Sequence, residues 1–293
     1  MRTTMNMGTL PALGLGIGWR PELALMIERR RDLGFIELLA ENHLGLRGVP
    51  AAVHRLRERG VTVIPHGVSL SLGSADLPDR ARLDALARLC RETQAPLVSE
   101  HVAFVRAGGL DSGHLLPVPR TREALDILVR NVRAAQAVLP VPLVLENIAS
   151  LFTWPGAEMR ETDFWNELLE RTGALMLLDV ENLYAERRNH GLNAVGFLNR
   201  IPLDRVAYVH VAGGVTGPDG LYHDTHAHPL PAPVLALLRQ VCERHRPPGI
   251  LLERDDLFPL DSVLNDELDA VATFLADDHV LPAYEPAEWH VAA

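Results

Sequence analysis

The sequence predicts an α/β fold, a single (β/α)8 TIM-like barrel, from three observations. Eight short apolar segments recur along the 293 residues. Most are continuous apolar runs, which are typical of parallel strands buried on both faces. Amphipathic helical patterns lie between them, and eight such units match the length of about 250 residues that a barrel of this kind needs.

The expected elements divide the chain into one domain, residues 1–293, with a barrel core over about 12–275 and a C-terminal extension over 276–293. The expected strands are 13–19, 35–43, 61–70, 96–104, 142–150, 174–184, 206–214 and 249–256. The expected helices are 20–34, 49–60, 76–94, 121–140, 162–173, 231–245 and 261–278. Gly34 and Gly60 end the first two, as glycine often does. A doubly wound sheet is the structural alternative, but "GLGIG" (14–18) lacks the G-x-G-x-x-G spacing.

Composition limits the classes of function. The net charge of −10 argues against a nucleic-acid partner. The chain has no lysine, which excludes Schiff-base chemistry. Its two cysteines form no CxxC motif, so a reducing compartment is expected. No signal peptide or membrane-spanning run is evident, which predicts a cytoplasmic protein without a membrane partner.

Polar residues stand at the carboxyl end of nearly every expected strand, where an apolar core would not select them. In a parallel barrel these ends meet at one face, which is where barrel enzymes carry out their chemistry. The residues, in chain order, are Glu41, Asn42, His43, His66, Ser99, Glu100, His101, Glu146, Asn147, Asp179, Glu181, Asn182, His210, Glu253, Arg254, Asp255 and Asp256.

The loop "YHDTHAHPL" (222–230), after the seventh strand, adds an aspartate and histidines to this face. Four imidazoles and four carboxylates become candidate metal ligands: His66, His101, His210, His226, Glu146, Asp179, Asp224 and Glu253. Buried carboxylates are costly unless they are paired, and divalent cations would neutralise them. Mixed imidazole and carboxylate ligands suit Fe, Mn or Zn. Eight ligands exceed one ordinary site, so two or three ions bridged by carboxylates are expected.

Taken singly, each residue has a simpler interpretation. One histidine at a strand end is more often a hydrogen-bonded structural residue than a ligand. Glu41, Asn42 and His43 fit an ordinary cap as well as a substrate contact, and Glu100 could orient a neighbouring histidine. The metal interpretation rests on the joint pattern, because acidic residues or histidines stand at six successive strand ends.

Seven short motifs together resemble a known enzyme family. They are "PHGVSLSLGS", "SEHVAF", "LENIAS", "LLDVENLY", "HVAGG", "DTHAHP" and "LLERDD", within residues 12–260. The set resembles the multinuclear non-heme iron-dependent oxidative enzymes, relatives of the methanobactin-biosynthesis oxidase. The resemblance implies a TIM-like barrel with two or three irons, Fe(II) and Fe(III) together, at the carboxyl face of the strands. It also implies O2 as co-substrate and a ribosomally made precursor peptide that is commonly modified at Cys.

The resemblance assigns roles to individual positions. His66, His101 and Glu146 look like the ligands of one iron. Glu146 would bridge to a second iron, whose other ligands are Asp179, His210 and Glu253. Asp224 and His226 would serve a third iron with help from the sixth strand. Further ligands, or residues that support ligands, would come from Asn147, Glu181, Asn182 and Glu100. Family members often carry Asn two residues after the aspartate or His three after it, whereas this chain has Glu181 and Asn182.

The candidate catalytic residues are Glu146, Asp179 and Asp255, and the candidate substrate contacts are Asn42, His43 and Arg254. For proton transfer, Asp255, Asp256 and His43 remain open. Many family members need a small partner protein that recruits the peptide leader, and here we expect it as a separate chain.

Two other functions remain open on the residues alone. A xylose-isomerase-like barrel, either a sugar isomerase or an endonuclease, also uses His, Glu and Asp on barrel strands with Zn or Mn. A barrel that binds metal or peptide without catalysis is the second. Iron content and dependence on O2 would separate them from the oxidative enzyme.

Overall fold

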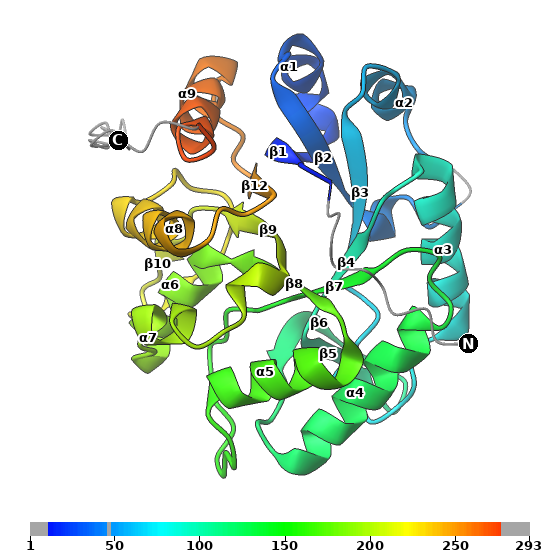
Figure 1. The fold of residues 1–293 in the computed structure, drawn as a ribbon, viewed down its shortest axis with the longest axis vertical. Coiled ribbons are helices and arrows are strands. Elements are labelled where there is room, and N and C mark those ends of the chain that lie inside the picture. Colours follow the sequence, from blue (N-terminus) through cyan, green and yellow to red (C-terminus); the bar gives the residue numbers. More distant parts are fainter. Residues whose placement is uncertain (1–10, 46–47, 277–293) are drawn as a thin grey trace.

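Eight parallel strands close into a barrel with helices on its outside (Figure 1), which confirms the predicted fold class. The computed structural model describes residues 11–45 and 48–276. Residues 277–293 of the expected C-terminal extension therefore lie outside the described residues. In spatial order the barrel strands are β1 (Gly14–Trp19), β12 (Gly249–Leu252), β9 (Val206–Val211), β8 (Leu175–Asp179), β7 (Leu143–Glu146), β4 (Val98–His101), β3 (Thr62–Gly67) and β2 (Leu33–Leu39).

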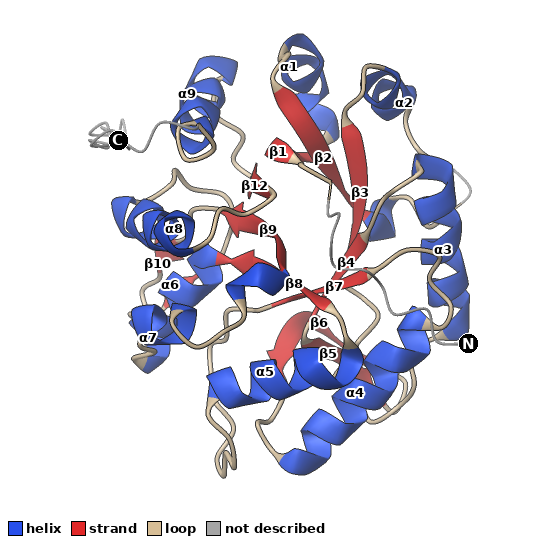
Figure 2. Cartoon of the chain, in the orientation of Figure 1, coloured by secondary structure: helices blue, strands red, loops and turns tan. Residues whose placement is uncertain are grey.

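The helices surround the barrel in chain order (Figure 2). They are α1 (Ala24–Arg29), α2 (Ala51–Glu58), α3 (Arg80–Thr93), α4 (Arg122–Gln136), α5 (Glu161–Thr172), α6 (Val180–His190), α7 (Ala194–Leu198), α8 (Ala232–Arg244) and α9 (Asp261–Ala272). Of these, α6 and α7 lie together between α5 and α8. Short 3-10 turns are η1 (Pro21–Leu23), η2 (Ala40–Asn42) and η3 (Leu203–Arg205). Within the described part of the chain, no helix is both long and apolar enough to span a bilayer.

Two hairpins extend from the carboxyl face of the barrel strands. The first, β5 (Ala103–Ala107) with β6 (Leu110–Pro117), follows β4 directly. The second, β10 (Val215–Thr216) with β11 (Tyr222–His223), follows β9. The sequence pattern predicts neither hairpin, because β10 and β11 have only two residues each and β6 carries little apolar alternation.

The expected sixth strand was too long. Residues 174–184 were read as one strand, but β8 ends at Asp179 and α6 begins at Val180. Asp179 caps this helix, since its Oδ1 accepts a hydrogen bond of 2.7 Å from the backbone N–H of Asn182. The apolar residues that follow are buried as part of α6. A short apolar segment does not show whether its residues are buried in a strand or in a helix.

Gly34 also differs from expectation. It lies within β2 rather than after α1, which ends at Arg29. A Cβ at position 34 would lie 1.9 Å from the carbonyl oxygen of Leu13, so the glycine permits close approach of two backbones. Gly60 follows α2 with φ +89°, as the prediction requires.

The interior of the barrel is built in two layers. The lower layer is an apolar plug formed by Leu13, Phe35, Ile64, Leu97, Val144, Leu175, Leu177, Ala207, Tyr208 and Leu251. Side chains two residues apart on a strand share a face, so the next inward position on each strand lies nearer the carboxyl end. The resulting pairs are Phe35 and Glu37, Ile64 and His66, Val144 and Glu146, Leu177 and Asp179, Tyr208 and His210, and Leu251 and Glu253. The second residues of these pairs therefore form a polar layer directly above the apolar plug.

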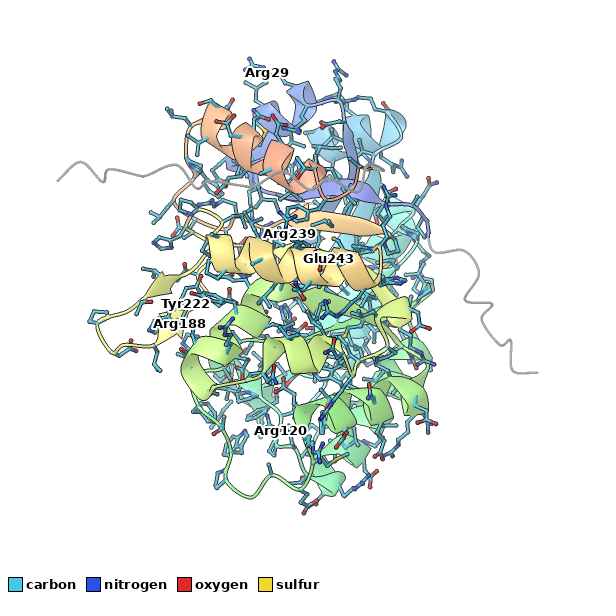
Figure 3. All side chains as sticks on the ribbon, turned by 60° about the vertical axis from the view of Figure 1, so that its left-hand side comes forward. Arg29, Arg120, Arg188, Tyr222, Arg239 and Glu243 are labelled. Carbon is cyan, nitrogen blue, oxygen red and sulfur yellow. The ribbon has the colours of Figure 1, made fainter. Side chains whose placement is uncertain are left out.

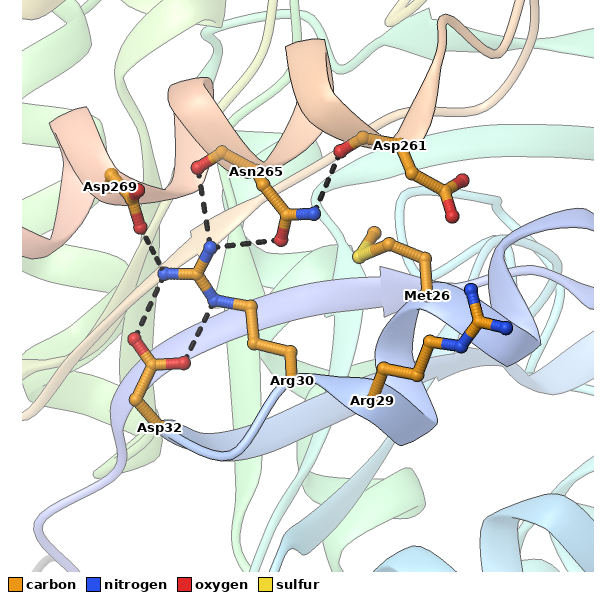
Figure 4. Close-up of a pocket in the computed structure, with 7 residues that line it drawn as sticks. All are labelled: Met26, Arg29, Arg30, Asp32, Asp261, Asn265 and Asp269. Atoms are coloured by element: carbon orange, nitrogen blue, oxygen red, sulfur yellow. Dashed lines mark hydrogen bonds and ion pairs between the residues drawn. The ribbon is translucent and has the colours of Figure 1, made fainter.

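The first and last βα units are joined outside the barrel by Arg30, which closes the ring of helices (Figure 4). Its guanidinium donates to both carboxylate oxygens of Asp32 at 2.8 and 2.9 Å, and to Asp269 on α9 at 2.6 Å. It also donates to the backbone and side-chain oxygens of Asn265 at 3.2 and 3.0 Å. The surface pocket between α1 and α9 is thus lined by a structural ion-pair network.

Replacement of Arg30 by Met should lower the free energy of unfolding by about 1–2 kcal/mol, because bonds to two partly exposed carboxylates are lost. Urea denaturation measures this change. Arg29→Met is the matched control, since Arg29 lines the same pocket but is exposed. Equal stability of the two variants would contradict the role of Arg30 in closing the ring.

Candidate metal centre

The barrel mouth brings all eight predicted metal ligands into one continuous cluster. Six of them are buried, and Asp224 and His226 are partly exposed. Parallel register places neighbours side by side, since His101 pairs with Glu146 and Asp179 pairs with His210. Among the described residues, the side chains form five overlapping sets of possible ligands, which we describe as three neighbouring groups.

The first group consists of His66, His101 and Glu146. Nε2 of His66 lies 3.3 Å, and Nε2 of His101 3.1 Å, from Oε2 of Glu146. The two imidazole rings stand edge to face with their centroids 4.6 Å apart. Two histidines and one carboxylate therefore converge on one small space.

The second group is on the other side of Glu146. Nδ1 of His210 lies 3.2 Å from Oε1 of Glu146, 3.1 Å from Oε2 of Glu253 and 3.9 Å from Oδ2 of Asp179. The two oxygens of Glu146 thus face two different sets of nitrogen and oxygen atoms. This is the arrangement that a carboxylate needs in order to bridge two ions.

The third group forms where the 222–230 loop meets α6. Nε2 of His226 lies 2.7 Å from Oδ1 of Asp224 and 3.6 Å from Oε2 of Glu181. The hydroxyl of Tyr222, on the hairpin that projects in Figure 3, donates to Oε1 of Glu181 at 2.9 Å. His226 has φ +50°, a rare conformation for a non-glycine residue, and such strain is typical of functional sites.

Unpaired buried atoms are concentrated in this cluster. Six polar atoms of the described residues here have no hydrogen-bond partner: Glu146 Oε2, Asp179 Oδ2, Glu181 Oε2, His210 Nδ1, Asp224 Oδ1 and His226 Nε2. Orphaned buried polar atoms are rare in native proteins and call for an explanation such as an ion. With metal–ligand bonds of about 2.1 Å, adjacent ligand atoms of an octahedron lie about 3 Å apart, as several do here. The residues fit metal ions.

Each of the four histidines has one ring nitrogen fixed by a neighbouring oxygen; in His226 this nitrogen, Nδ1, also lies 3.4 Å from Oε2 of Glu253. A fixed partner at this position leaves the other nitrogen free as a ligand, which is the usual arrangement at metal sites. The contacts are His66 Nδ1 to Ser99 Oγ at 2.8 Å, His101 Nδ1 to the Gly67 carbonyl at 3.0 Å, His210 Nε2 to Glu37 Oε2 at 3.1 Å, and His226 Nδ1 to Asp255 Oδ2 at 3.2 Å.

The electrostatics of the cluster also favour cations. Burial raises the pKa of Asp179 and Glu181 well above the ordinary value, and the nearby Asp224 raises both further. For His210 and His226, burial alone would lower the pKa, but the surrounding carboxylates raise it well above the ordinary value. Retained protons would therefore offset part of the negative charge when no metal is bound.

Glu37, Tyr208 and Arg20 belong to the site but were not predicted from the sequence. Glu37 has a partial signal, since it is an acidic residue within the apolar run of β2, but only the structure shows that it faces inward. Arg20 also has one, since it directly follows the first strand. Its guanidinium forms an ion pair with Asp255 and lies 3.8 Å from Oε1 of Glu253.

Arg254 lies elsewhere than the substrate-binding prediction requires. It is 2% exposed, and its guanidinium donates to Glu267 on α9 at 2.7 Å. The neighbouring Asp255 instead reaches the cluster through His226. Asn42 is exposed and His43 is partly buried at the carboxyl end of β2.

The residues named as further ligands or supports take different positions. Asn147 is used by the backbone, because its side chain exchanges two hydrogen bonds of 2.9 Å with the main chain of Asp179. Asn182 donates to the Asn147 carbonyl at 2.9 Å, and its Oδ1 has no partner among the described residues. Glu100 accepts from the backbone N–H groups of Leu70 and His101. Glu181 joins the third group.

A family model described as "RiPP precursor modification enzyme MbnB/TglH/ChrH" matches residues 14–276. A UPF0276 protein of Streptomyces avermitilis is 52% identical over 280 residues, covering 92% of this chain and 56% of the relative. The chain thus spans little more than half the length of that relative. A UPF0276 protein of Rhizorhabdus wittichii is 40% identical over 247 residues, covering 84% of this chain and 87% of the relative.

Solved structures share the architecture. The IOLI protein with a bound zinc atom has a TM-score of 0.60 at 12% identity, covering 89% of this chain and 98% of that chain. D-psicose 3-epimerase with D-fructose has a TM-score of 0.57 at 12% identity, covering 89% of this chain and 99% of that chain. At these identities the likeness concerns the fold alone. The match over residues 14–276 shows that the chain belongs to the MbnB/TglH/ChrH family of RiPP precursor modification enzymes.

Proposed function

We propose that this chain oxidises a ribosomally made precursor peptide at cysteine, with two or three irons and O2, in the biosynthesis of a peptide natural product. The family supports a precursor peptide as the substrate. The number of ion-binding groups at the barrel mouth supports a multinuclear centre.

The observation that carries the proposal is the position of Glu146. Its Oε2 faces the two imidazoles of His66 and His101, and its Oε1 faces His210. Two histidines with one carboxylate are the ligand set of non-heme Fe(II) oxygenases, in which open positions remain for substrate and O2. A shared carboxylate would keep a second ion beside that one.

The other ligands would hold the remaining ions. Asp179, His210 and Glu253 would hold the second ion, and Glu181, Asp224 and His226 the third. When bound, iron supplies the one-electron and O2 chemistry that side chains cannot perform. Asp179 is rigid because one of its oxygens caps α6 while the other faces the cluster.

Residues at the rim would bind the peptide and transfer protons. Asp255 lies at the mouth between His226 and Arg20, with its side chain 38% exposed, so it can accept a proton from a bound peptide. Burial lowers the pKa of His43, so its ring is neutral and can form a hydrogen bond with the substrate. Asn42, exposed beside it, offers an amide.

The setting of the reaction follows from the substrate. A cytoplasmic location would keep a peptide cysteine reduced until it reaches the site. We further propose that a separate small protein binds the leader of the precursor and delivers it to the mouth.

Glu146→Gln should weaken iron binding by about 100-fold or more, because loss of a ligand exceeds the 10- to 100-fold effect typical of an outer residue. The amide keeps the shape but lacks the charge needed for bridging. Iron per chain is measured after anaerobic loading and desalting, together with peptide turnover.

Glu186→Gln is the matched control for that variant. Glu186 is also buried, but it accepts hydrogen bonds from Ser150 outside the cluster. We expect this control to retain iron. Wild-type iron content and full turnover in Glu146→Gln would exclude the bridging role.

Loading with Fe(II) should release protons, because ligands bind metals in their deprotonated forms. The raised pKa values of Asp179, Glu181, His210 and His226 favour the protonated forms of these groups in the metal-free chain. Affinity should therefore rise with increasing pH. Anaerobic titration in weakly buffered solution with a pH indicator counts the protons. Uptake of iron without proton release would contradict this charge balance.

The activity itself is tested with a candidate Cys-bearing precursor peptide, sought among the short reading frames next to the gene of this chain, and with its Cys→Ser counterpart. Iron-loaded protein should change the mass of the Cys peptide when O2 is present, and should leave the Ser peptide unchanged. Mass spectrometry measures both. O2-independent conversion of a sugar by Zn- or Mn-loaded protein, with no change in the peptide, would instead favour a xylose-isomerase-like enzyme.

A further inference from the structure

A chain of buried polar side chains lies directly beneath the metal cluster. The hydroxyl of Tyr208 donates to Oε2 of Glu37 at 2.6 Å and lies 2.8 Å from Oγ of Ser99. Oγ of Ser99 is in turn 2.8 Å from Nδ1 of His66. Nε2 of His210 lies 3.1 Å from the same Oε2 of Glu37. All five side chains are buried.

The direction of each hydrogen bond follows from the number of protons available. Tyr208 has a single hydroxyl proton, which it donates to Oε2 of Glu37. Ser99 must then donate to the oxygen of Tyr208. The oxygen of Ser99 is left as an acceptor, so Nδ1 of His66 carries the proton. The lone pair of His66 is therefore on Nε2, which faces Glu146.

Glu37 thus reaches His66 through Tyr208 and Ser99, which is the first branch. The second branch is its direct contact with His210. Because Oε2 accepts, Nε2 of His210 keeps its proton when a metal binds, and Nδ1 is the nitrogen that offers the lone pair. That nitrogen faces Glu146 and Glu253 and has no hydrogen-bond partner among the described residues. One carboxylate oxygen thus orients two histidines that belong to two different ligand groups.

We propose that Glu37 is a positioning residue that sets the ring tautomers of His66 and His210 and so prepares two neighbouring metal subsites together. The inference rests on the proposed function only in requiring a metal centre at this cluster. It concerns the support of the ligands rather than the reaction that they serve.

The other two ligand histidines do not depend on Glu37. His101 is held by the carbonyl of Gly67, and His226 is held by Asp255. Glu37 itself lies near His66 and Glu253 and could be taken for a ligand. Its Oε2 already accepts hydrogen bonds from Tyr208 and His210. A positioning role depends on the hydroxyl of Tyr208, whereas a role as a direct metal ligand does not.

Tyr208→Phe isolates one branch. It keeps the ring, which packs on Phe35 with the centroids 5.7 Å apart, and leaves the contact between His210 and Glu37 in place. Titration of the metal-free chain with Co(II), followed by its visible absorption, should show one equivalent bound about 10- to 100-fold more weakly. The other equivalents should keep wild-type affinity.

Glu37→Gln should affect both branches. The amide lacks the charge, and its NH2 group can donate, which reverses the constraint on Tyr208 and His210. Two equivalents of Co(II) should therefore bind about 10- to 100-fold more weakly. Matched controls are Tyr184→Phe, which removes a buried hydroxyl bonded to Arg188, and Glu186→Gln; both should titrate like the wild type.

Nitrogen-15 NMR of Zn(II)-loaded protein with labelled histidines reads the tautomers directly. In the wild type we expect a proton on Nδ1 of His66 and on Nε2 of His210. In Tyr208→Phe the His66 signal alone should change. A role limited to packing would move neither signal selectively.

Several outcomes would overturn the inference. Wild-type Co(II) affinity in both variants would do so, and would leave the proposed function untouched. Weaker Co(II) binding in Glu37→Gln, together with wild-type Co(II) affinity in Tyr208→Phe, would indicate that Glu37 is a direct ligand instead. Weakened subsites in both variants, in a chain that oxidises no peptide, would support the inference while the proposed function fails. A wild-type chain that binds no divalent cation would overturn both.

Discussion

The arrangement of the whole barrel mouth depends on the need to neutralise buried negative charge. Seven carboxylates lie in contact with four imidazoles above an apolar plug: Glu37, Glu146, Asp179, Glu181, Asp224, Glu253 and Asp255. Such a set cannot remain ionised in a low-dielectric interior without cations or protons. The unpaired atoms that converge on common points indicate that metal cations fill this role. Every other feature of the site keeps those atoms in place.

The fold could be predicted because it depends on patterns that repeat. Eight apolar runs separated by amphipathic helices leave few alternatives to a closed parallel barrel. The ends of the strands could not be predicted as accurately as the fold. The run through residues 174–184 changes from strand to helix at Asp179, and the change is marked by a cap that needs coordinates to recognise. Gly34 was misplaced for a similar reason, since contact with Leu13 between distant segments determines its role.

The predicted ligand positions come together in space because each stands at the carboxyl end of a strand and points inward. Residues with less distinctive chemistry were missed. Glu37 is surrounded by apolar neighbours in a strand buried on both faces, so the sequence does not show which of its residues face inward. Tyr208 looks like an ordinary core residue, and only its hydroxyl contacts the polar layer. Arg254 pairs with Glu267 instead of reaching the site, because this ion pair depends on where α9 packs, and Arg20, for which no role was predicted, reaches Asp255.

Glu146 is the centre of this account, since two groups of ligands share its carboxylate. Anomalous diffraction at the iron edge, from crystals of the anaerobically loaded chain, locates each ion directly. The account predicts one iron beside Oε2 with His66 and His101, and another beside Oε1 with His210, separated by about 3.5–4 Å as in other two-metal sites. A single iron, or irons that do not contact Glu146, would contradict it.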